Sequence, residues 1–329
     1  MPTSLTAASK PGRALKLMKQ GTTHSISGFL NIDKPPGWTS SDVVAKLRSA
    51  FQLRQRGLKI GHGGTLDPLA TGVLPICVGR TTRLSKFVLT GNKSYLMSAM
   101  LGVSTDTYDS EGTETHRQDH SMVKSTDLVS VMPEFRGEIE QVPPMYSAIK
   151  RNGQPLYKLA RKGKTIAREP RKVEVHKLEL TTWDPPHFSL KIDCGSGFYA
   201  RSLANDVGQR LGCGAHMTSL RRTRAGDFHI TDSRSLDSLI ACAADDLWTR
   251  HLLKPDHVLK QFPAITLDDA ESVHFLHGRV IQRIFTDRET SKSRIRVYGK
   301  NGEFVGLGRV DEEANFIYPA TVLKDSIGS

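Results

Sequence analysis

The stretch from Gly61 to Pro75, GHGGTLDPLATGVLP, constrains the fold more than any other part of the chain. Its glycines permit backbone conformations that other residues avoid, and Pro68 stiffens the chain directly after Asp67. Such a segment is neither helix nor strand, so it predicts an ordered loop that presents one carboxylate. The apolar run Val73–Val78 then predicts a buried strand behind the loop. A lone Gly-Asp-Pro turn usually serves only turn chemistry, but fifteen patterned residues favour a reactive Asp67.

The remaining pattern predicts an α+β fold, with a mixed sheet flanked by helices. Short strands and helices of uneven length alternate along the chain, and several strands are spaced as hairpins. The expected strands are Gly28–Asp33, Val73–Val78, Tyr95–Gly102, Lys177–Thr182 and Phe188–Cys194. The expected helices begin near Thr39, cover Thr82–Leu89, follow Gly195-Ser196-Gly197 with an apolar stripe of Leu203, Val207 and Leu211, and lie near Ser235–Leu253.

The charge balance favours a polyanionic partner. The chain has 46 Lys and Arg against 34 Asp and Glu, which gives a formal net charge of +12. A surplus of this size suits RNA or an anionic membrane surface. No apolar run approaches the roughly 18 residues of a spanning helix, so a soluble RNA-binding protein is expected and a membrane partner is not.

The cysteines and the first residues bear on compartment and cofactor. Four cysteines lack the spacing of metal ligands and are expected to be reduced, so we expect no metal and no cofactor; they are Cys77, Cys194, Cys213 and Cys242. Met1–His24 carries basic residues and no acid, and it is expected to be a disordered basic arm. An organelle transit peptide is the alternative. The expected location is the cytoplasm.

Five segments together resemble one protein family. The loop around Asp67 is similar to the motif G-H-x-G-x-L-D-P-x-A-T-G of the TruB family of tRNA pseudouridine synthases. Four further matches follow in the family's order: Lys93-Ser94-Tyr95 with Thr105–Gly112, Gln141–Lys150 with Tyr157–Arg161, Gly197–Ser202, and Leu220–Gly226. The departures, Thr82 with Arg83 and Ala200, remove no reacting group. The loop is more similar to the bacterial type than to the guide-RNA-dependent relatives, which implies a stand-alone, monomeric enzyme.

The resemblance implies a role for individual residues. It makes Asp67 the catalytic residue, Arg201 its cationic partner, and Tyr95 the ring that stacks on the uracil. The substrate-binding positions that it carries over are His62, Gly64, Arg83, Lys150, Tyr199 and Leu220. Read without the family, Tyr95 would be an ordinary core aromatic at a strand start, and Arg201 would be a surface charge.

The family's activity is the conversion of uridine 55 in the T-loop of tRNA to pseudouridine, with no metal and no redox change. The resemblance leaves open whether Asp67 attacks the ribose C1′, adds to uracil C6 or assists deprotonation at C2′. The target base must be flipped out of the T-loop, and His62 is expected to fill the vacated space. Nine Lys or Arg between Lys150 and Lys172, against the single acid Glu169, suggest phosphate contacts.

The chain after Lys254-Pro255-Asp256 changes character. Short strands at Arg294–Tyr298, Phe304–Val310 and Phe316–Pro319 suggest a small barrel, which resembles the family's PUA-like RNA-binding domain. The expected organisation is an arm over residues 1–24, a catalytic domain over 25–255 and a PUA-like domain over 256–329. Lys254–Gln261 is expected to be a linker. A structural β cap without RNA contact is the alternative for the last domain.

Two other functions fit parts of the sequence. The string Gly61-His62-Gly63-Gly64 is superficially similar to an esterase oxyanion loop, but the chain contains no G-x-S-x-G nucleophile motif. An RNA chaperone or ribosome-assembly factor that needs no catalysis would fit the basic surface and the C-terminal barrel. The presence of Asp67, Tyr95 and Arg201 argues for an enzyme.

Overall fold

A computed structural model describes residues 26–147, 149–151, 153–160, 163, 166–283, 294–311 and 315–323. The expected basic arm at Met1–His24 lies outside these residues, and so do the side chain of Lys150 and the whole of Arg161.

The chain forms the following elements in order: β1 (Gly28–Lys34), α1 (Ser40–Ala50), β2 (Ile60–His62), β3 (Thr71–Val78), η1 (Gly79–Leu84), α2 (Ser85–Leu89), β4 (Lys93–Leu101), β5 (Val103–Thr105), β6 (Glu114–Arg117), α3 (Ser125–Val131), η2 (Met132–Phe135), β7 (Gly137–Gln141), β8 (Lys150–Arg151), β9 (Gln154–Pro155), α4 (Leu156–Ala160), β10 (Arg171–Asp184), β11 (His187–Cys194), α5 (Ala200–Arg210), β12 (Ala215–Ala225), β13 (Phe228–His229), η3 (Ile230–Asp232), β14 (Arg234–Ser235), α6 (Leu236–Ala241), η4 (Ala244–His251), η5 (Pro255–Leu259), β15 (Ala264–Thr266), α7 (Asp269–Leu276), β16 (Ile281–Gln282), β17 (Ile295–Tyr298), β18 (Phe304–Asp311) and β19 (Phe316–Val322). The η elements are 3-10 helices.

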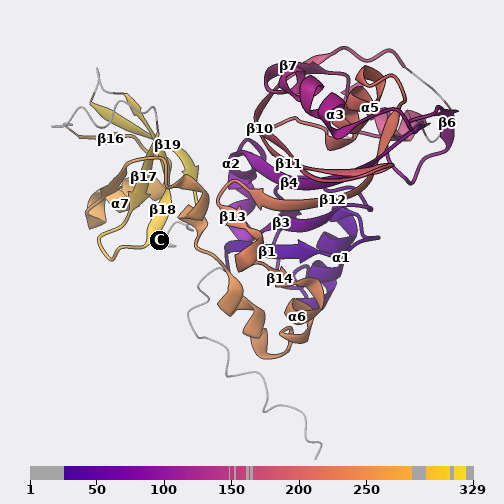
Figure 1. Cartoon of the computed structure of the whole chain (residues 1–329). Coiled ribbons are helices and arrows are strands. Elements are labelled where there is room, and N and C mark those ends of the chain that lie inside the picture. The colour runs from indigo at the N-terminus through magenta and orange to yellow at the C-terminus, as the bar shows by residue number, and fades with distance from the viewer. Residues whose placement is uncertain are drawn as a thin grey trace, which may run out of the picture.

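One large sheet organises the first 235 or so residues, in the strand order β14-β1-β3-β12-β4-β11-β10-β7. Within this path, only β1 with β14 and β12 with β3 are parallel pairs. The expected α+β fold with a largely antiparallel mixed sheet is therefore confirmed. Figure 1 shows α1 and α6 at the β1 and β14 end of this sheet, and α3 and α5 at the β7 and β10 end.

Helix α1 begins beside the loop that carries Asp67, and helix α5 carries Arg201. Helix α1 begins at a capping box, in which the Thr39 hydroxyl accepts a hydrogen bond from the Asp42 N–H at 3.0 Å. Its apolar side chains at Val43 and Leu47 are fully buried. Helix α5 buries the predicted stripe residues Leu203 and Val207, so both helices dock on the sheet by the faces that their sequences predict.

Two predicted helices are wrong in detail. Thr82–Leu89 is not one helix, because η1 extends to Leu84 and the α-helix α2 begins only at Ser85. The helix expected near Ser235–Leu253 is split into α6 and η4. Asp245 and Asp246 lie at φ 52° and 59°, a left-handed conformation that no continuous α-helix contains.

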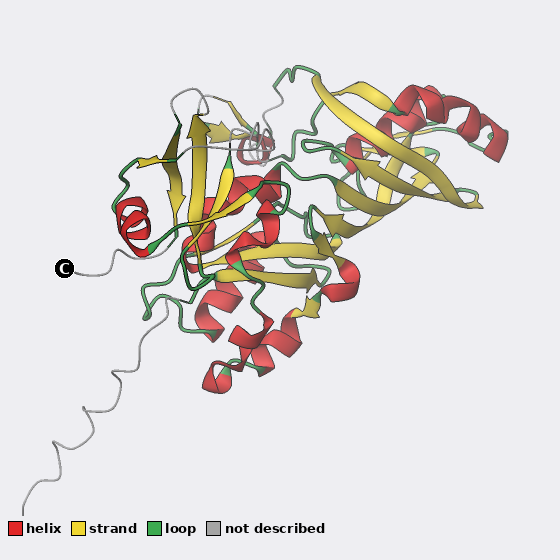
Figure 2. Cartoon of the chain, turned by 90° about the vertical axis from the view of Figure 1, so that its left-hand side faces the viewer, coloured by secondary structure: helices red, strands yellow, loops and turns green. Residues whose placement is uncertain are grey.

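The C-terminal strands form a separate five-stranded sheet with the order β15-β17-β18-β19-β16. Strands β17, β18 and β19 cover the three segments predicted from the sequence, and the sheet curls as expected for a PUA-like fold. Figure 1 shows this sheet to the left of the large one, and Figure 2 turns it toward the viewer. Helix α7 contacts its strands β16 and β19.

The segment expected to be a linker is packed. Pro255–Leu259 forms a 3-10 helix, and its Val258 and Leu259 side chains are buried. They belong to an apolar cluster that both sheets share. This shared cluster contains Phe29, Val73, Cys77, Leu84, Val88, Ala225, Phe228, Val258, Leu259, Leu307 and Leu323. The two sheets are therefore joined by a common core.

Within the described residues, no helix has the length and apolar character needed to cross a membrane.

Candidate active site

A cavity of about 310 Å³ opens where the Asp67 loop meets β4, β12 and the start of α5. It contains most of the predicted site residues, which come from segments far apart in the sequence. Those that line it are Gly64, Asp67, Tyr95, Tyr199, Arg201 and Leu220. The volume lies at the lower end of the range for small-molecule sites, about 300–1,000 Å³.

The Asp67 loop is held by hydrogen bonds to its backbone. At the start of α1, the buried Ser40 hydroxyl accepts from the Leu66 N–H at 2.8 Å and donates to the Leu66 carbonyl at 3.0 Å. The Gly37 N–H and the Lys34 ammonium both donate to the Pro68 carbonyl. Contacts on both sides of Asp67 therefore fix where its carboxylate points.

Arg222 supplies the third restraint. Its guanidinium donates to the Val73 carbonyl at 2.7 Å and to the Gly64 and Thr65 carbonyls at 3.3 Å, and only 2% of its surface is exposed. The side chain thus ties β12 and β3 to the loop. Sequence reasoning missed this role, although the Arg221-Arg222 pair stood inside a recognised motif.

Arg201 pairs with Asp67 as the family resemblance implied. Its Nη2 lies 2.8 Å from Asp67 Oδ2, and its Nη1 lies 3.5 Å from Asp109 Oδ2. The guanidinium also donates to the carbonyls of Tyr146 and Thr107, at 2.9 and 3.3 Å. Arg201 is 5% exposed, so it is a buried cation with two carboxylates and two carbonyls around it.

Asp109 lies in the segment Thr105–Gly112, and the sequence pattern predicts no role for it on its own. It is 3% exposed, and it accepts hydrogen bonds from the Thr107 hydroxyl and the Glu111 N–H. The arrangement orients Asp109 toward Arg201 and leaves Asp67 as the carboxylate that faces the cavity. About 35% of the Asp67 side chain is exposed, against 4% for Asp109.

Burial raises the pKa of Asp67 above the ordinary value for an aspartate. The Arg201 guanidinium opposes this rise, and the negative charge of Asp109 adds to it. The cavity walls surround the carboxylate, although its outer edge is open to the cavity. Arg201 therefore offsets part of the cost of keeping Asp67 ionised.

Tyr95 lies across the cavity on β4. Its ring centroid is 6.4 Å from that of Phe198, with the planes inclined by 33°, and burial raises the pKa of its hydroxyl. The phenol is therefore neutral at physiological pH. Two aromatic rings thus form one wall, suited to stacking on a planar base. Phe198 was not among the predicted site residues.

Two buried lysines adjoin the site. Burial lowers the pKa of Lys34 to about 8 and that of Lys93 to about 8. The Lys34 ammonium donates to the Pro35 carbonyl at 2.8 Å and to the Trp38 carbonyl at 2.6 Å. The Lys93 ammonium donates to the carbonyls of Leu89 and Gly91. Backbone carbonyls therefore surround both ammonium groups. Lys93 also lines the cavity.

Tyr199 and Leu220 reach the cavity from different elements. The Tyr199 backbone is fixed by Gln141, whose amide oxygen accepts from the Tyr199 N–H at 3.0 Å. Gln141 in turn donates to the Tyr199 carbonyl at 3.3 Å. Leu220 lies on β12, where its carbonyl accepts a hydrogen bond from the Thr71 hydroxyl.

Two predicted substrate-binding residues, His62 and Arg83, are not among the described residues that line this cavity. His62 lines a neighbouring cavity, and burial together with the charge of Arg222 lowers its pKa. Its Nδ1 is buried without a hydrogen-bond partner among the described residues. Arg83 is exposed and donates to the Val322 carbonyl of the C-terminal sheet at 2.7 Å. The Lys150 backbone forms part of β8, and its side chain lies outside the described residues.

The cysteines show no catalytic arrangement. All four are free thiols, and burial raises the pKa of Cys77 and of Cys194 to about 12. Across the described ranges, no three His, Cys, Asp or Glu side chains gather in a group that could hold a metal ion.

Three family models match successive parts of the chain. Residues 48–200 match the N-terminal domain of the TruB family pseudouridylate synthases. Residues 201–259 match the C-terminal domain of tRNA pseudouridylate synthase B, and residues 263–323 match the C-terminal part of pseudouridine synthase II TruB.

Curated relatives match nearly the whole chain. Proteins named tRNA pseudouridine synthase B from Pseudomonas fluorescens strain Pf0-1 and Stutzerimonas stutzeri strain A1501 are 40% and 41% identical to it. Each match covers 88% of this chain and 93% of the relative. Among solved structures, the crystal structure of a Cbf5-Nop10-Gar1 complex contains a chain that matches with a TM-score of 0.67 and 26% identity, over 91% of this chain and 85% of that one. A chain in the structure of an H/ACA RNP bound to a substrate RNA containing 2'-deoxyuridine has the same fold, with a TM-score of 0.67 and 23% identity over 91% and 86%.

Proposed function

The chain belongs to the TruB family of pseudouridine synthases, and we propose that it isomerises uridine 55 in the T-loop of tRNA to pseudouridine. The observation that carries the proposal is the pair formed by Asp67 and Arg201 at 2.8 Å on the wall of a base-sized cavity. Placing a carboxylate in a partly desolvated cavity costs free energy unless a cation compensates it, so the pair of Asp67 and Arg201 supports catalysis over RNA binding alone.

The reaction needs only acid–base and nucleophilic groups. The bond from uracil N1 to ribose C1′ breaks, the base turns, and a bond forms between C5 and C1′. The proton on C5 is lost and N1 gains one, so atoms balance without an oxidant, a reductant or a metal. An ionised carboxylate at the ribose or the base can start this sequence, and Asp67 is the carboxylate that faces the cavity.

Arg201 would serve as a positioning cation. A guanidinium offers several donors in one plane, and here they are shared among Asp67, Asp109 and two carbonyls. This set fixes the plane of the guanidinium and therefore the direction of the Asp67 carboxylate. It also favours the charged form of Asp67, which burial disfavours.

The aromatic wall would hold the uracil. Tyr95 and Phe198 present two inclined rings opposite the Asp67 loop. Because Tyr95 keeps its proton, we assign it stacking near C5 and not the role of a charged base. The base reaches this wall only after it has been flipped out of the T-loop, at a cost of a few kcal/mol in lost stacking.

We further propose that the enzyme works alone, without a guide RNA. The solved neighbours come from multiprotein or RNA-containing assemblies. The relatives at about 40% identity are each named tRNA pseudouridine synthase B. The basic charge of the chain would supply the phosphate contacts that position the tRNA.

Replacing Asp67 tests the assignment most directly. Asp67→Asn keeps the side-chain shape and removes its negative charge, so we expect no detectable pseudouridine. Binding of tRNA should stay within about tenfold of wild type, because most affinity comes from phosphate contacts. The measurement is single-turnover formation of pseudouridine at position 55. A variant with more than a few per cent of the wild-type rate would remove Asp67 from the reaction.

Arg201→Lys keeps the positive charge but not the planar set of donors. We expect a rate loss of at least about a hundredfold with near-normal tRNA affinity, since an ammonium cannot reach both carboxylates and both carbonyls. The exposed Arg210 in α5, whose guanidinium pairs with Glu134, provides the matched control Arg210→Lys. Equal activity of the two variants would show that the fork geometry of Arg201 is unimportant.

The substrate is tested with a minimal RNA. An isolated T-arm stem-loop should be modified at the uridine equivalent to position 55, because a folded loop presents its bases for flipping. An unstructured RNA of the same composition should react poorly. Equal rates on the two RNAs would contradict recognition of the loop's shape.

A further inference from the structure

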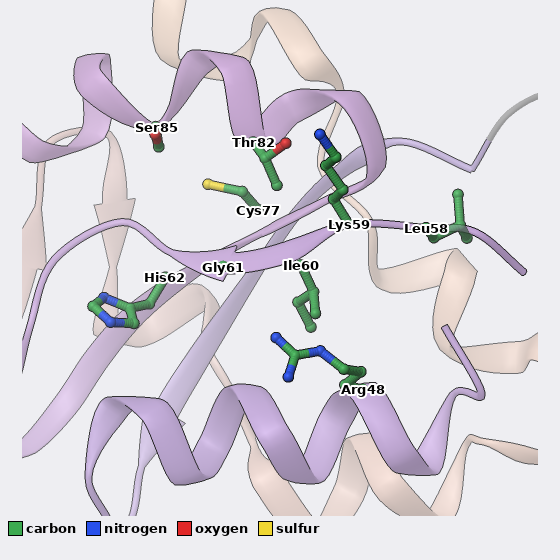
Figure 3. Close-up of a pocket in the computed structure, with 9 residues that line it drawn as sticks. All are labelled: Arg48, Leu58, Lys59, Ile60, Gly61, His62, Cys77, Thr82 and Ser85. Carbon is green, nitrogen blue, oxygen red and sulfur yellow. The ribbon is translucent and has the colours of Figure 1, made fainter. Parts of the chain in front are cut away.

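A second cavity, of about 430 Å³, borders β2, the strand that directly precedes the loop with Asp67. Figure 3 shows it between α1 and the turn of η1 and α2, with β2 passing through its centre. The residues that line it are Arg48, Leu58, Lys59, Ile60, Gly61, His62, Cys77, Thr82 and Ser85. The Asp67 chemistry does not use this cavity.

The cavity has the charge of an anion site. Two of the residues that line it, Arg48 and Lys59, are cations, and none is Asp or Glu. Neither cation forms an ion pair with an acidic residue in the described part of the chain. Figure 3 shows Arg48 projecting from α1 toward β2, while Lys59 projects from the opposite face of the strand toward Thr82. The two cations therefore flank Gly61 from two sides.

Gly61 leaves the middle of the cavity bare. A Cβ at this position would meet no atom within 4 Å, and the backbone of Gly61 is not in the left-handed region. The missing side chain is therefore not required by packing or by φ. It keeps open a space over the strand that even an alanine would begin to fill.

The edge of β2 adds backbone donors. Lys59 accepts a hydrogen bond from the Gly79 N–H, and Gly63 donates one to the Pro75 carbonyl, so these residues face β3. Hydrogen-bonded pairs alternate along an antiparallel ladder. The N–H groups of Ile60 and His62 consequently face the other edge, where no described strand pairs with β2.

The position of the cavity identifies its ligand. His62 lines this cavity and Gly64 lines the Asp67 cavity, and two residues span no more than about 7 Å. Both cavities therefore serve one short stretch of any RNA that crosses the loop. Resting on the proposed function, we propose that the second cavity binds the phosphate of a nucleotide next to the target uridine, through Arg48, Lys59 and the β2 edge.

The first test removes the charges. We expect the Arg48→Gln, Lys59→Gln double variant to reduce the slope of log affinity against log salt by roughly 0.7 to 0.9, the value for one lost phosphate contact, and each single variant to reduce it by part of that amount. Affinity for a T-arm stem-loop is measured in the Asp67→Asn background, so that no turnover occurs. The control is Lys46→Gln, a cation on the same helix about 200° around its axis from Arg48.

The second test locates the phosphate. Stem-loops carry one uncharged methylphosphonate at each position around the target uridine in turn. One position should weaken binding of the protein with Arg48 and Lys59 intact by about tenfold and leave binding of the double variant unchanged. Losses that add at every position would show that the two cations act only as diffuse surface charge and would overturn the proposal.

The third test fills the space without removing charge. Valine suits a strand, and a Cβ at Gly61 would meet no atom within 4 Å, so we expect the unfolding midpoint of Gly61→Val to match wild type. Its affinity for the stem-loop should fall about as far as that of the double variant. Native affinity would show that the cavity stays empty in the complex. If the wild-type protein forms no pseudouridine in the stem-loop at all, the proposed function fails; if it does and these variants behave like Lys46→Gln, only the second site fails.

Discussion

Two opposing effects set the charge of Asp67. Burial and the neighbouring Asp109 raise its pKa, whereas Arg201 lowers it. When a charged group is removed from water, its attraction to a single cation often fails to offset the full free energy of desolvation. Asp67 is thus an acid whose ionisation depends on the geometry of its partners, and small changes in that geometry should appear in the pH profile.

We predict that the single-turnover rate falls on acidification with a midpoint above about 3.9, the ordinary pKa of an aspartate. The ionised carboxylate is present above its pKa and is lost as the pH falls through it. Asp109→Asn removes a negative charge that raises the pKa of Asp67, so the midpoint should move to lower pH. The exposed Asp237→Asn is the control, and circular dichroism at each pH checks folding. A midpoint that rises or stays in Asp109→Asn would contradict this electrostatic account.

At the scale of elements, the site depends on how β3 and β12 approach each other. Gly72 has φ 99°, and a Cβ there would lie 2.2 Å from the Arg222 carbonyl oxygen. This glycine lets the two parallel strands meet at Arg222, whose side chain then reaches the Asp67 loop. The strand junction and the loop are therefore one unit.

We predict that Gly72→Ala both destabilises the protein and abolishes activity. A left-handed conformation costs a non-glycine residue about 1–3 kcal/mol, and the backbone clash adds to it. Gly226→Ala is the matched control: it has φ 57° in the turn after β12, but its Cβ would meet nothing within 4 Å. Denaturant unfolding should show a clearly larger loss for Gly72→Ala. Equal losses would mean that the close approach has no energetic consequence.

The elements also show what the sequence could predict. The Asp67 loop, β3 and the stripe of α5 were predicted because glycine, proline and apolar spacing act locally. Arg222 was not, since its contact with Thr65 joins residues 157 positions apart and depends on strand pairing that no local pattern encodes. The break at Asp245 was missed for a similar reason, because apolar periodicity continues through it while the backbone does not. The ion pair between Arg201 and Asp67 was predicted from the family resemblance. The second carboxylate beside Arg201, that of Asp109, was found only in the structure.

The whole molecule has two sheets but not two independent cores. The main apolar cluster contains no residue beyond Leu252, so the catalytic part has a core of its own. The shared cluster, however, contains Leu307 and Leu323 of the C-terminal sheet together with Phe29 and Val73 of the large sheet. The hydrogen bond from the Arg83 guanidinium to the Val322 carbonyl adds a polar contact between the two sheets.

We predict that removal of Phe262–Ser329 leaves the catalytic part folded but less stable, because it exposes the shared cluster. Single-turnover rates at saturating enzyme should stay within about tenfold, while tRNA affinity and its salt slope fall. The intact protein should unfold in one transition. Two separate transitions, with the first leaving the melting temperature of the catalytic part unchanged, would contradict a common core.

Because Arg222 holds the Asp67 loop, it determines which partner must change its conformation when RNA binds. With carbonyls of Gly64, Thr65 and Val73 bound to one buried guanidinium, the loop holds its shape before any RNA arrives. Ordering a loop during association reduces affinity, and a loop already ordered avoids that loss. Under the proposed function, the tRNA is then the partner that must deform, and the Asp67 loop keeps its shape while the T-loop opens against it. An RNA whose loop is already open should therefore bind with little further rearrangement on either side.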